Sequence, residues 1–450
     1  MIIVLTKQER ELFDLISKVA KTIVIDGETV TPRVAGGWVR DKILKINSSD
    51  IDITLDKISG YEFATKLVNE FKDKKKHLPK VNIIQANPEK SKHLETAIVR
   101  IYDICVDFAN LRSEQYNNSR IPIISNGTPT EDAERRDLTI NSLFYNIITN
   151  EIEDFTGRGK TDLKKGILDT PVDPLITFND DPLRILRIIR FYAKFKYTIT
   201  DRIVEAIKIS SIRDAFAKKI SCERVYQELN KMLSYENGLL GIEKIIELEF
   251  YEPILKIDCS KFDFDFVKVQ CFDMITEIDL KTDKRLLGFS LLVYPLIVTK
   301  IVDENLNPDS VLKNALKCDK SLFKSIKIIR ENILFLYEKL KNKQKLDYSD
   351  IIDIILTCKE HIKESMLFSY IKTKDVRISN IIELIKHENL LEILKIKPLL
   401  NGKDFKKRVE KDKIGEYLKK SIRIQILYEI TDKKELLSKV LHDHQENCVL

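Results

Sequence analysis

The stretches Gly36-Gly37-Trp38-Val39-Arg40-Asp41 and Asp50-Ile51-Asp52 decide how the first part of this chain folds. In a β-strand successive side chains point to opposite faces, so Asp50 and Asp52 would share one face while Ile51 enters the core. Two neighbouring carboxylates repel each other unless a cation neutralises them, and hard divalent ions such as Mg²⁺ prefer carboxylate and phosphate oxygens. The pattern therefore predicts Asp50 and Asp52 as catalytic metal ligands.

Twelve residues separate the second of the paired glycines, Gly37, from Asp50. A Gly-Gly turn that opens a helix lets backbone N–H groups approach a triphosphate, and the helix N-terminus and Arg40 add favourable charge. Two metal ions beside such a pocket can activate an attacking 3′-hydroxyl and neutralise a leaving pyrophosphate. An isolated Asp-x-Asp is typical of a solvated strand edge, but with the glycines at this spacing it favours a nucleotide site.

A third carboxylate is usual in such sites, and Asp107 is the best candidate. In Ile104-Cys105-Val106-Asp107-Phe108, alternation places the apolar side chains on one face and Asp107 on the other. Asp103 shares the face of Asp107 and is the competing candidate. The alternative interpretation is an edge-strand aspartate that faces water.

Strand-like segments are confined to the first part of the chain. Residues 34–35, 51–55, 98–111 and 143–148 are predicted as strands, whereas from about residue 180 apolar residues recur with helical spacing. Glycines and prolines within residues 157–174 interrupt the pattern and mark a junction. We therefore predict an α+β protein in which a small mixed sheet comes first and helices follow.

Composition limits the classes of function. A chain of 450 residues exceeds what one hydrophobic core usually supports. Its 76 basic and 70 acidic residues leave a net charge of only +6, so a nucleic-acid surface must come from local clusters. The seven cysteines include no C-x-x-C pair, which argues against a zinc site or a disulfide framework. We expect an intracellular soluble protein without membrane spans, in the cytoplasm, with the nucleus or mitochondrion as further locations.

Two further segments extend the pattern: Asp132-Ala133-Glu134-Arg135-Arg136-Asp137-Leu138-Thr139-Ile140-Asn141 and Asp180-Asp181-Pro182-Leu183-Arg184-Ile185-Leu186-Arg187. With the glycine and aspartate motifs they resemble the class II tRNA nucleotidyltransferases, the family of CCA-adding enzymes and bacterial-type poly(A) polymerases. The likeness runs from about residue 32 to 233, is strongest to the fungal branch in residues 106–114, and is faint beyond. It implies a catalytic, DNA polymerase beta-like head (1–155), a neck with nucleobase-recognition helices (156–235), a helical body (236–330) and a helical tail (331–450).

The resemblance also implies roles for individual residues. Those expected to bind the triphosphate are Gly36, Gly37, Arg40, Asp41 and Arg112. Those expected to contact the nucleotide are Arg136, Asp137, Asn141, Asp181, Arg184 and Arg187. Without the resemblance, residues 132–141 would be a charged helix face with surface salt bridges, and residues 180–187 a capped helix start.

Asp181 and Arg184 correspond to the base-reading pair of the family, with Asp180 where the family usually has Glu. Three positions apart on a helix, they would be neighbours on one face and present an acceptor and several donors together. Cytosine and adenine each have an exocyclic amine beside an unprotonated ring nitrogen, whereas uracil and guanine present the reverse polarity. The pair could thus accept CTP and ATP and reject UTP and GTP without a template.

Two other segments resemble structural motifs of the family. Ser221-Cys222-Glu223-Arg224-Val225 would brace the nucleotide-binding helix, with Ser221 as its N-cap. Residues 154–160 would be a flexible joint between head and neck, and a plain junction explains them almost as well.

Residues 395–423 contain eleven basic and four acidic residues, the densest basic stretch of the chain. Family members hold tRNA with a helical tail, so Lys403, Lys406, Lys407 and Arg408 are candidate RNA contacts. A solvated, lysine-rich helix face is the alternative.

The resemblance implies template-independent addition of CCA to the 3′ end of tRNA from CTP and ATP, with two Mg²⁺ ions and release of pyrophosphate. A poly(A) polymerase, or an enzyme that adds only C or only A, shares nearly all these motifs. A catalytically inactive RNA-binding protein is a remote alternative that the intact Asp50 and Asp52 disfavour. The sequence does not fix the oligomeric state, for which we favour a monomer.

Overall fold

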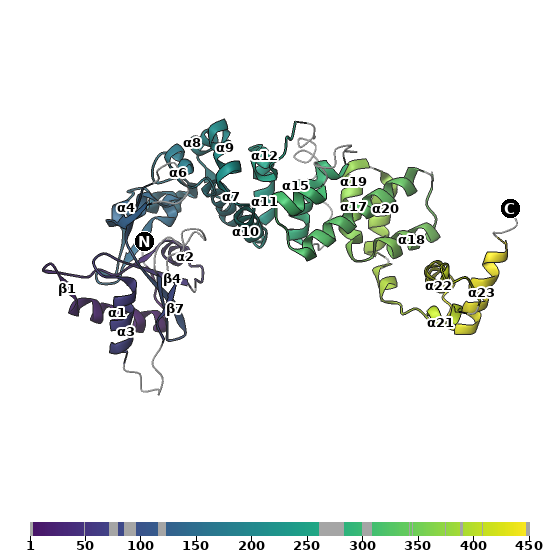
Figure 1. Cartoon of the computed structure of the whole chain (residues 1–450), viewed down its shortest axis with the longest axis horizontal. Helices are drawn as coiled ribbons and strands as arrows, with labels where there is room; N and C mark the ends of the chain where they lie inside the picture. Colours follow the sequence, from purple (N-terminus) through teal and green to yellow (C-terminus); the bar gives the residue numbers. More distant parts are fainter. Residues whose placement is uncertain are drawn as a thin grey trace. The chain divides into compact units, whose positions relative to one another are not determined.

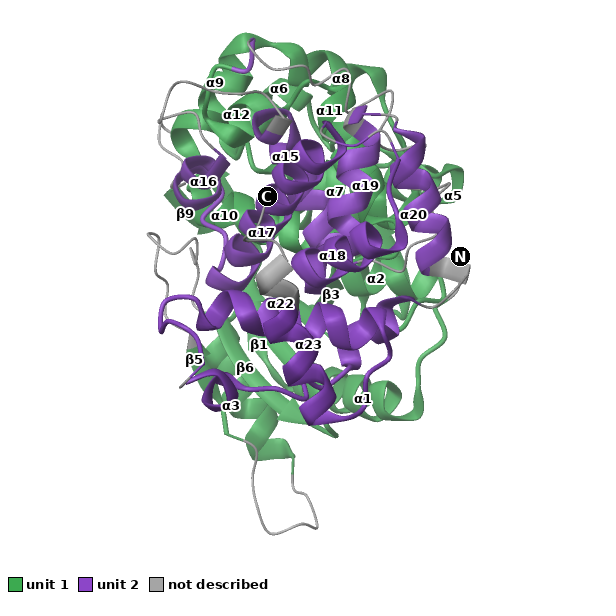
Figure 2. Cartoon of the chain, turned by 90° about the vertical axis from the view of Figure 1, so that its right-hand side faces the viewer, with its two compact units in different colours: residues 1–258 green, residues 259–450 purple. Residues whose placement is uncertain are grey.

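The computed structural model describes residues 3–48, 50–71, 80–84, 96–115, 123–260, 283–298, 308–341, 343, 345–373, 375–387, 390–406 and 408–446. The chain divides into two compact units, residues 1–258 and residues 259–450 (Figure 2). Among the described residues, no helix has the length and apolar character needed to cross a membrane.

A seven-stranded mixed sheet lies in the N-terminal part of the first unit (Figure 1). In spatial order its strands are β11 (Glu151–Asp154), β10 (Leu143–Asn146), β3 (Arg33–Ala35), β4 (Asp50–Leu55), β7 (Ile104–Asn110), β6 (Thr96–Ile101) and β5 (Asn82–Ile84). Strands β4 and β7 run parallel, whereas the other neighbouring pairs are antiparallel. The start of β4 therefore lies in the middle of the sheet.

Helices cover the apolar face of this sheet. Helix α3 (Gly60–Glu70) packs against β6 and β7, and α1 (Lys7–Thr22) packs against α3. Ile51 of β4 is buried, and the buried ring of Phe108 in β7 lies 5.4 Å from that of Phe63 in α3, measured between ring centroids. Because side chains alternate along a strand, the aspartates of β4 and β7 point to the opposite face.

The rest of the first unit consists of short strands and helices. These elements are β1 (Val24–Ile25), β2 (Glu28–Thr29), α2 (Gly37–Ile43), β8 (Arg112–Gln115), β9 (Ile123–Asn126), α4 (Pro129–Glu134), η2 (Thr139–Asn141), α5 (Gly159–Lys165), β12 (Ile167–Leu168), α6 (Pro174–Asp180), α7 (Arg184–Phe195), β13 (Thr198–Ile199), α8 (Asp201–Lys208), α9 (Ser210–Lys219), α10 (Cys222–Leu233), α11 (Gly238–Glu247) and α12 (Tyr251–Leu255). Helix α7 packs its apolar side against α10 and α11.

The second unit contains helices and no strand among its described residues. They are α15 (Lys284–Val298), α16 (Pro308–Ser310), η5 (Val311–Ala315), α17 (Lys320–Lys341), α18 (Tyr348–Cys358), η6 (Lys359–His361), α19 (Ile362–Thr373), α20 (Val376–His387), η7 (Leu390–Lys395), α21 (Gly402–Phe405), α22 (Ile414–Leu427) and α23 (Lys433–Glu446). One apolar cluster joins α17 to α20 around Ile352 and Ile378, and another joins α21 to α23 around Phe405 and Leu436.

The predicted α+β fold, a small mixed sheet followed by helices, is confirmed. The strand-like segment 98–111 is a hairpin, because Tyr102 and Asp103 form a turn with φ angles of 50° and 63° between β6 and β7. No glycine or proline marks this turn, and Asp103 is the one residue in it of a type that turns favour.

The four predicted parts of the chain, 1–155, 156–235, 236–330 and 331–450, stay a proposal. The chain divides into its two compact units after residue 258. The boundary predicted after residue 330 falls inside α17. That limit would have to move to one end of the helix, because domain boundaries fall in exposed linkers with few crossing contacts.

The segment that resembles a flexible joint is held by several polar contacts. The Asp169 carboxylate accepts from Arg158 and from Nε of Arg202, the latter at 2.6 Å. Nη2 of Arg158 also donates to the carbonyls of Thr170 at 2.8 Å and Pro171 at 3.0 Å. Gly157 and Gly159, on either side of Arg158, therefore lie in a loop that these hydrogen bonds hold in place. Movement at this joint stays a prediction.

Candidate active site

One cavity of about 860 Å³ in the first unit collects most of the predicted site residues. Residues of β3, β4, β7 and α2 line it together with residues of α7 and α10. Its lining contains ten basic and five acidic side chains, an excess that favours a polyanion such as a triphosphate. The predicted residues that line it are Gly36, Gly37, Arg40, Asp52, Asp107, Arg112, Arg136, Asp137, Asn141, Asp181, Arg184 and Arg187.

The predicted carboxylates lie on neighbouring strands in the middle of the sheet. Asp52 of β4 is the cross-strand partner of Asp107 in β7, and Asp50 lies two positions before Asp52 on the same face. Desolvation by the surrounding protein raises the pKa of Asp52. The positive charge of Arg136 partly opposes this shift, and the negative charge of Asp50 raises the pKa further. Burial, and then the charges of Asp52 and Asp50, raise the pKa of Asp107. A cation near these carboxylates would favour their ionised forms.

Asp103, the competing third carboxylate, lies in the turn between β6 and β7. Its side chain is 89% exposed and approaches Arg100 at 3.9 Å. Asp107 lines the cavity and Asp103 does not, so the geometry favours Asp107. Asp50 lies on the shared sheet face but outside the cavity lining.

The donor set fits a hard divalent ion. Mg²⁺ in nucleotide sites is usually held by one or two carboxylates together with substrate phosphates and water. Within the described residues, no group of three or more His, Cys, Asp or Glu side chains could hold a metal ion by itself. Asp50, Asp52 and Asp107 would therefore supply part of the coordination, and phosphate oxygens of a bound nucleotide would supply much of the rest.

The glycine pair brings the backbone to the cavity at the start of α2. Gly36 has a φ angle of 74°, which glycine adopts without strain. A Cβ at this position would lie only 2.7 Å from Nη1 of Arg136, which itself donates to the carbonyl of Asn141 at 3.3 Å. Any side chain at position 36 would thus displace an arginine of the cavity.

Arg40 and Asp41 of α2 bind each other. Nε of Arg40 donates to Oδ1 of Asp41 at 2.8 Å, and Nη1 of Arg40 donates to the side chain of Asn141. The Asp41 carboxylate also lies 3.6 Å from the ammonium of Lys194 in α7. Asp41 is outside the cavity lining, so it can influence the site by orienting Arg40, and its predicted part in triphosphate binding stays a proposal.

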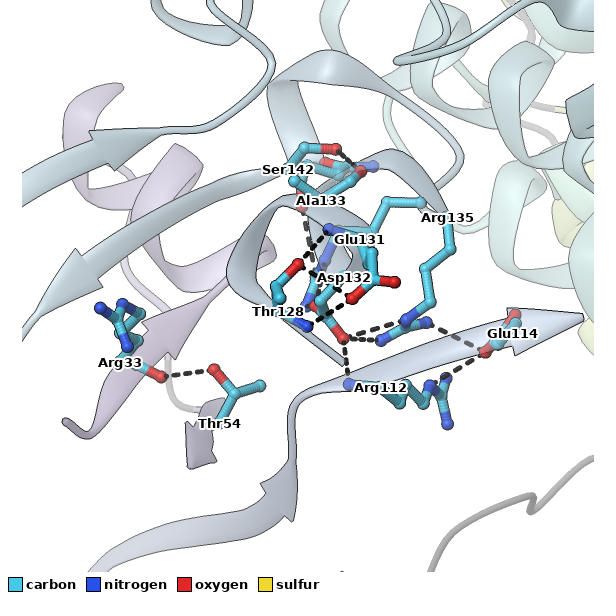
Figure 3. Close-up of polar contacts among 12 residues, drawn as sticks. Arg33, Thr54, Arg112, Glu114, Thr128, Glu131, Asp132, Ala133, Arg135 and Ser142 are labelled. Carbon is cyan, nitrogen blue, oxygen red and sulfur yellow. Dashed lines mark hydrogen bonds and ion pairs between the residues drawn. The ribbon is translucent and has the colours of Figure 1, made fainter. Parts of the chain in front are cut away.

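The second predicted motif is buried and not a solvated helix face. Asp132 has no exposed side-chain surface and accepts from Nε of Arg135 at 2.9 Å (Figure 3) and from Nη2 of Arg136 at 2.7 Å. Burial alone would raise the pKa of Asp132, but the charges of Arg136 and Arg135 lower it to about 2. The interpretation of this segment as surface salt bridges is therefore wrong.

Asp137, Asn141 and Arg187 form a chain of contacts across the cavity wall. Nδ2 of Asn141 donates to Oδ1 of Asp137 at 2.9 Å, and Nε of Arg187 donates to Oδ2 at 2.8 Å. Burial alone would raise the pKa of Asp137, but Arg187 and Asn141 hold it well below its usual range. These contacts join the segment after α4 to α7, and all three residues line the cavity.

Asp181 and Arg184 both line the cavity, but they do not share a helix as predicted. Asp181 follows α6 in an extended conformation, with φ −138° and ψ 97°, and α7 begins at Arg184. Pro182 explains this, because the residue before a proline is disfavoured in the helical region. A turn still brings the two together, since the Arg184 N–H donates to the Asp181 carbonyl at 3.0 Å.

Each member of this pair is held by other residues. Arg224 of α10 donates to both carboxylate oxygens of Asp181, at 2.8 and 3.4 Å. The buried guanidinium of Arg184 donates to the carbonyl of Arg135 at 2.6 Å and to that of Thr177 at 3.3 Å. The segment expected to brace this region therefore contacts Asp181 directly through Arg224.

Sequence reasoning missed several polar residues of the cavity. Glu228 of α10 accepts from Nε of Arg190 at 2.8 Å and lies 3.9 Å from Arg187, and Arg190 also donates to the hydroxyl of Tyr235 at 3.0 Å. The sequence did carry a signal for the basic residues of α7. They recur every three or four positions from 184 to 194 and therefore share one face of the helix.

The candidate RNA contacts lie in the second unit. Lys403, Lys406 and Arg408 are exposed at and after α21, and Lys407 lies outside the described residues. Asp404 is engaged by Lys433 at 2.8 Å. The exposed side chains can meet phosphates, and their contact with RNA stays a prediction.

Comparison with known proteins supports the resemblance in the first unit. Residues 32–169 match the family described as "Poly A polymerase head domain", and residues 196–257 match "Probable RNA and SrmB- binding site of polymerase A". The CCA tRNA nucleotidyltransferase of Saccharomyces cerevisiae, described as mitochondrial, is 43% identical over 287 residues, which are 61% of this chain and 52% of that protein. A tRNA nucleotidyltransferase of Schizosaccharomyces pombe is 42% identical over 259 residues, 56% of this chain and 54% of that protein. The chain thus spans about half the length of the curated relatives it matches.

Solved structures show the same fold. A CCA-adding enzyme in an apo form has a TM-score of 0.71 at 21% identity, covering 98% of this chain and 96% of that one. The CCA-adding enzyme of Thermotoga maritima in complex with tRNA has a TM-score of 0.69 at 20% identity, with the same coverage. Residues 32–169 of the chain therefore match the poly A polymerase head domain, and the resemblance to CCA-adding enzymes inferred from the motifs is confirmed.

Proposed function

We propose that this chain is a CCA-adding tRNA nucleotidyltransferase, which extends the 3′ end of tRNA from CTP and ATP and releases pyrophosphate. The observation that carries the proposal is one cavity lined both by the carboxylates of Asp52 and Asp107 and by the base-reading candidates Asp181 and Arg184. Relatives that share 42–48% identity with parts of this chain are named tRNA or CCA tRNA nucleotidyltransferases, which supports the same substrate here.

Nucleotidyltransferases of this superfamily generally use divalent metal ions, and we propose two Mg²⁺ ions for this chain. Asp50, Asp52 and Asp107 are the residues that would hold them. Such ions help a 3′-hydroxyl to attack the α-phosphate and neutralise the charge on the departing pyrophosphate. The backbone at Gly36 and Gly37 and the cationic side chains of the cavity would orient the triphosphate.

Base selection would rest on Asp181 and Arg184. The carboxylate would accept from the exocyclic amine of cytosine or adenine, and the guanidinium would donate to the unprotonated ring nitrogen. Because Arg224 holds Asp181 and two backbone carbonyls hold Arg184, both groups are oriented before a base arrives. Preorganised polar groups lose less freedom on binding, and a base of reversed polarity would place an acceptor against the carboxylate and a donor against the guanidinium.

The test is to incubate a tRNA that lacks its last three nucleotides with each nucleoside triphosphate singly and with all four together. We expect addition of C with CTP alone, completion to CCA with CTP and ATP, and no extension with UTP or GTP alone. A long A tail would identify a poly(A) polymerase, and C without A, or A without C, would identify a partial enzyme. RNA binding without any incorporation would identify an inactive RNA-binding protein.

Three further proposals concern the tRNA contacts, the cellular location and the oligomeric state. Exposed Lys403, Lys406 and Arg408 would anchor the tRNA elbow through phosphate contacts. Two relatives are described as mitochondrial, which supports a mitochondrial as well as a cytoplasmic location. We propose that the chain works as a monomer.

A further inference from the structure

Glu114 is a buried carboxylate beside the cavity that the proposed chemistry does not use. It lies on β8, which pairs with β9 in a two-stranded hairpin, and its side chain is only 4% exposed. Its Oε1 lies 2.9 Å from Nε of Arg112 and 3.2 Å from Nη1 of Arg135, as Figure 3 shows. Its Oε2 lies 4.0 Å from Nη2 of Arg184.

All three of these arginines line the cavity, whereas Glu114 does not. The contact with Arg135 is a hydrogen bond, so it restrains the orientation of that guanidinium, whereas the contacts with Arg112 and Arg184 are attractions between opposite charges. Without the negative charge, three clustered guanidiniums would repel one another and would shift toward solvent. Glu114 therefore helps to set where the cavity presents its cations.

The contact with Arg184 links the sheet-bearing part of the unit to the base-reading candidate. Arg184 is the first residue of α7, yet its Nη2 donates to the carbonyl of Arg135 at 2.6 Å. Arg135 is held in turn by Glu114 at 3.2 Å and by Asp132 at 2.9 Å. Nη2 of Arg184 is thus held by the carbonyl of Arg135 after α4, and the negative charge of Glu114 on the β8 hairpin lies 4.0 Å from the same nitrogen.

We propose that Glu114 is a specificity-determining positioning residue, which orients Arg184 and so contributes to the rejection of uracil and guanine. The inference rests on the proposed function, because it takes Arg184 as the donor that reads the base. Glu114 would touch neither the nucleotide nor a metal ion and would act through Arg184, directly and by way of Arg135.

The test uses Glu114→Gln, which keeps the shape of the side chain and removes its charge. The measurement is kcat/KM for CTP and for UTP on a tRNA that lacks its last three nucleotides. We expect the CTP-to-UTP ratio to fall about tenfold, mainly through a higher KM for CTP. Arg184→Ala should lower the ratio at least as far, and the double variant should equal Arg184→Ala, because the two residues act in series.

Two further variants separate positioning from folding. Glu114→Asp retains the charge one methylene further back, so it should lower the ratio by only about threefold, and it supplies the measurement if Glu114→Gln does not fold. Glu153→Gln is the matched control, because Glu153 is a partly buried carboxylate of β11 that binds Arg33 at 2.6 Å and lies outside the cavity lining. It should lower stability and leave the ratio unchanged.

The outcomes distinguish the inference from the proposed function. If Arg184→Ala lowers the ratio and neither Glu114 variant does, or if the losses add in the double variant, the role of Glu114 is wrong and the proposed function stands. If Arg184→Ala itself leaves the ratio unchanged, the base-reading role of Arg184 is wrong, and the inference about Glu114 falls with it.

Discussion

Replacing Asp132 by Asn should destabilise the head by about 2–3 kcal/mol. Its side chain has no exposed surface and receives bonds from Arg135 at 2.9 Å and from Arg136 at 2.7 and 3.1 Å. A pKa lowered from 3.8 to about 2 corresponds to about 2 kcal/mol of favourable interaction. Removing one partner of a buried ion pair costs about 3–5 kcal/mol, but here the arginine side chains are 17% and 19% exposed, so water can compensate in part.

Urea denaturation followed by tryptophan fluorescence measures this loss. Trp38 is the single tryptophan of the chain, is 2% exposed and donates to Glu9 at 3.2 Å, so its emission reports unfolding of the head. The midpoint should fall while the slope stays the same. Glu70→Gln is the control, because it removes an exposed ion pair with Lys18 and should change little. A loss for Asp132→Asn of less than about 1 kcal/mol would refute the reasoning.

The same carboxylate predicts a pH dependence. Because the pKa of Asp132 is lowered in the folded state, its contribution is fully present above the unfolded pKa near 3.8 and is lost as the pH falls toward 2. The difference in free energy of unfolding between the wild type and Asp132→Asn should be constant from about pH 7 to 5 and shrink below about pH 4. A difference that grows on acidification would contradict the assignment.

Three other substitutions test the site. Gly36→Ala should lower kcat/KM for CTP at least about tenfold in steady-state kinetics, because the φ angle is 74° and a Cβ would meet Arg136; wild-type kinetics would contradict this. Asp52→Asn should abolish incorporation and leave tRNA affinity unchanged in a filter-binding assay, and persistent turnover would remove Asp52 from the metal site. Lys403→Ala combined with Lys406→Ala should weaken tRNA binding and reduce the salt dependence by about one to two phosphate contacts; an unchanged salt slope would argue against an RNA role.

The parts of the site that depend on local pattern could be predicted from the sequence. Asp50 and Asp52 share a sheet face because alternation within one strand is a local property. The glycine at position 36 was predictable for the same reason, since its positive φ angle belongs to the turn that opens α2. Asp107 was already the preferred third carboxylate in the sequence, but its position beside Asp52 required the strand register.

The contacts that orient the site join residues far apart in sequence, so no local pattern reveals them. Arg224 reaches Asp181 across 43 positions, and Arg135 reaches Glu114 across 21. The position of Asp181 outside the helix of Arg184 could have been predicted locally. Pro182 disfavours a helical conformation at Asp181, and the prediction of one shared helix did not take this into account.

The most direct test of the central claim is to sequence the 3′ ends of tRNA products after incubation with all four nucleoside triphosphates at equal concentration. The wild-type chain should yield ends that terminate in CCA, and Asp52→Asn should leave the ends unextended. Incorporation of U or G at a frequency similar to that of C or A, or extension well beyond three nucleotides, would contradict the claim.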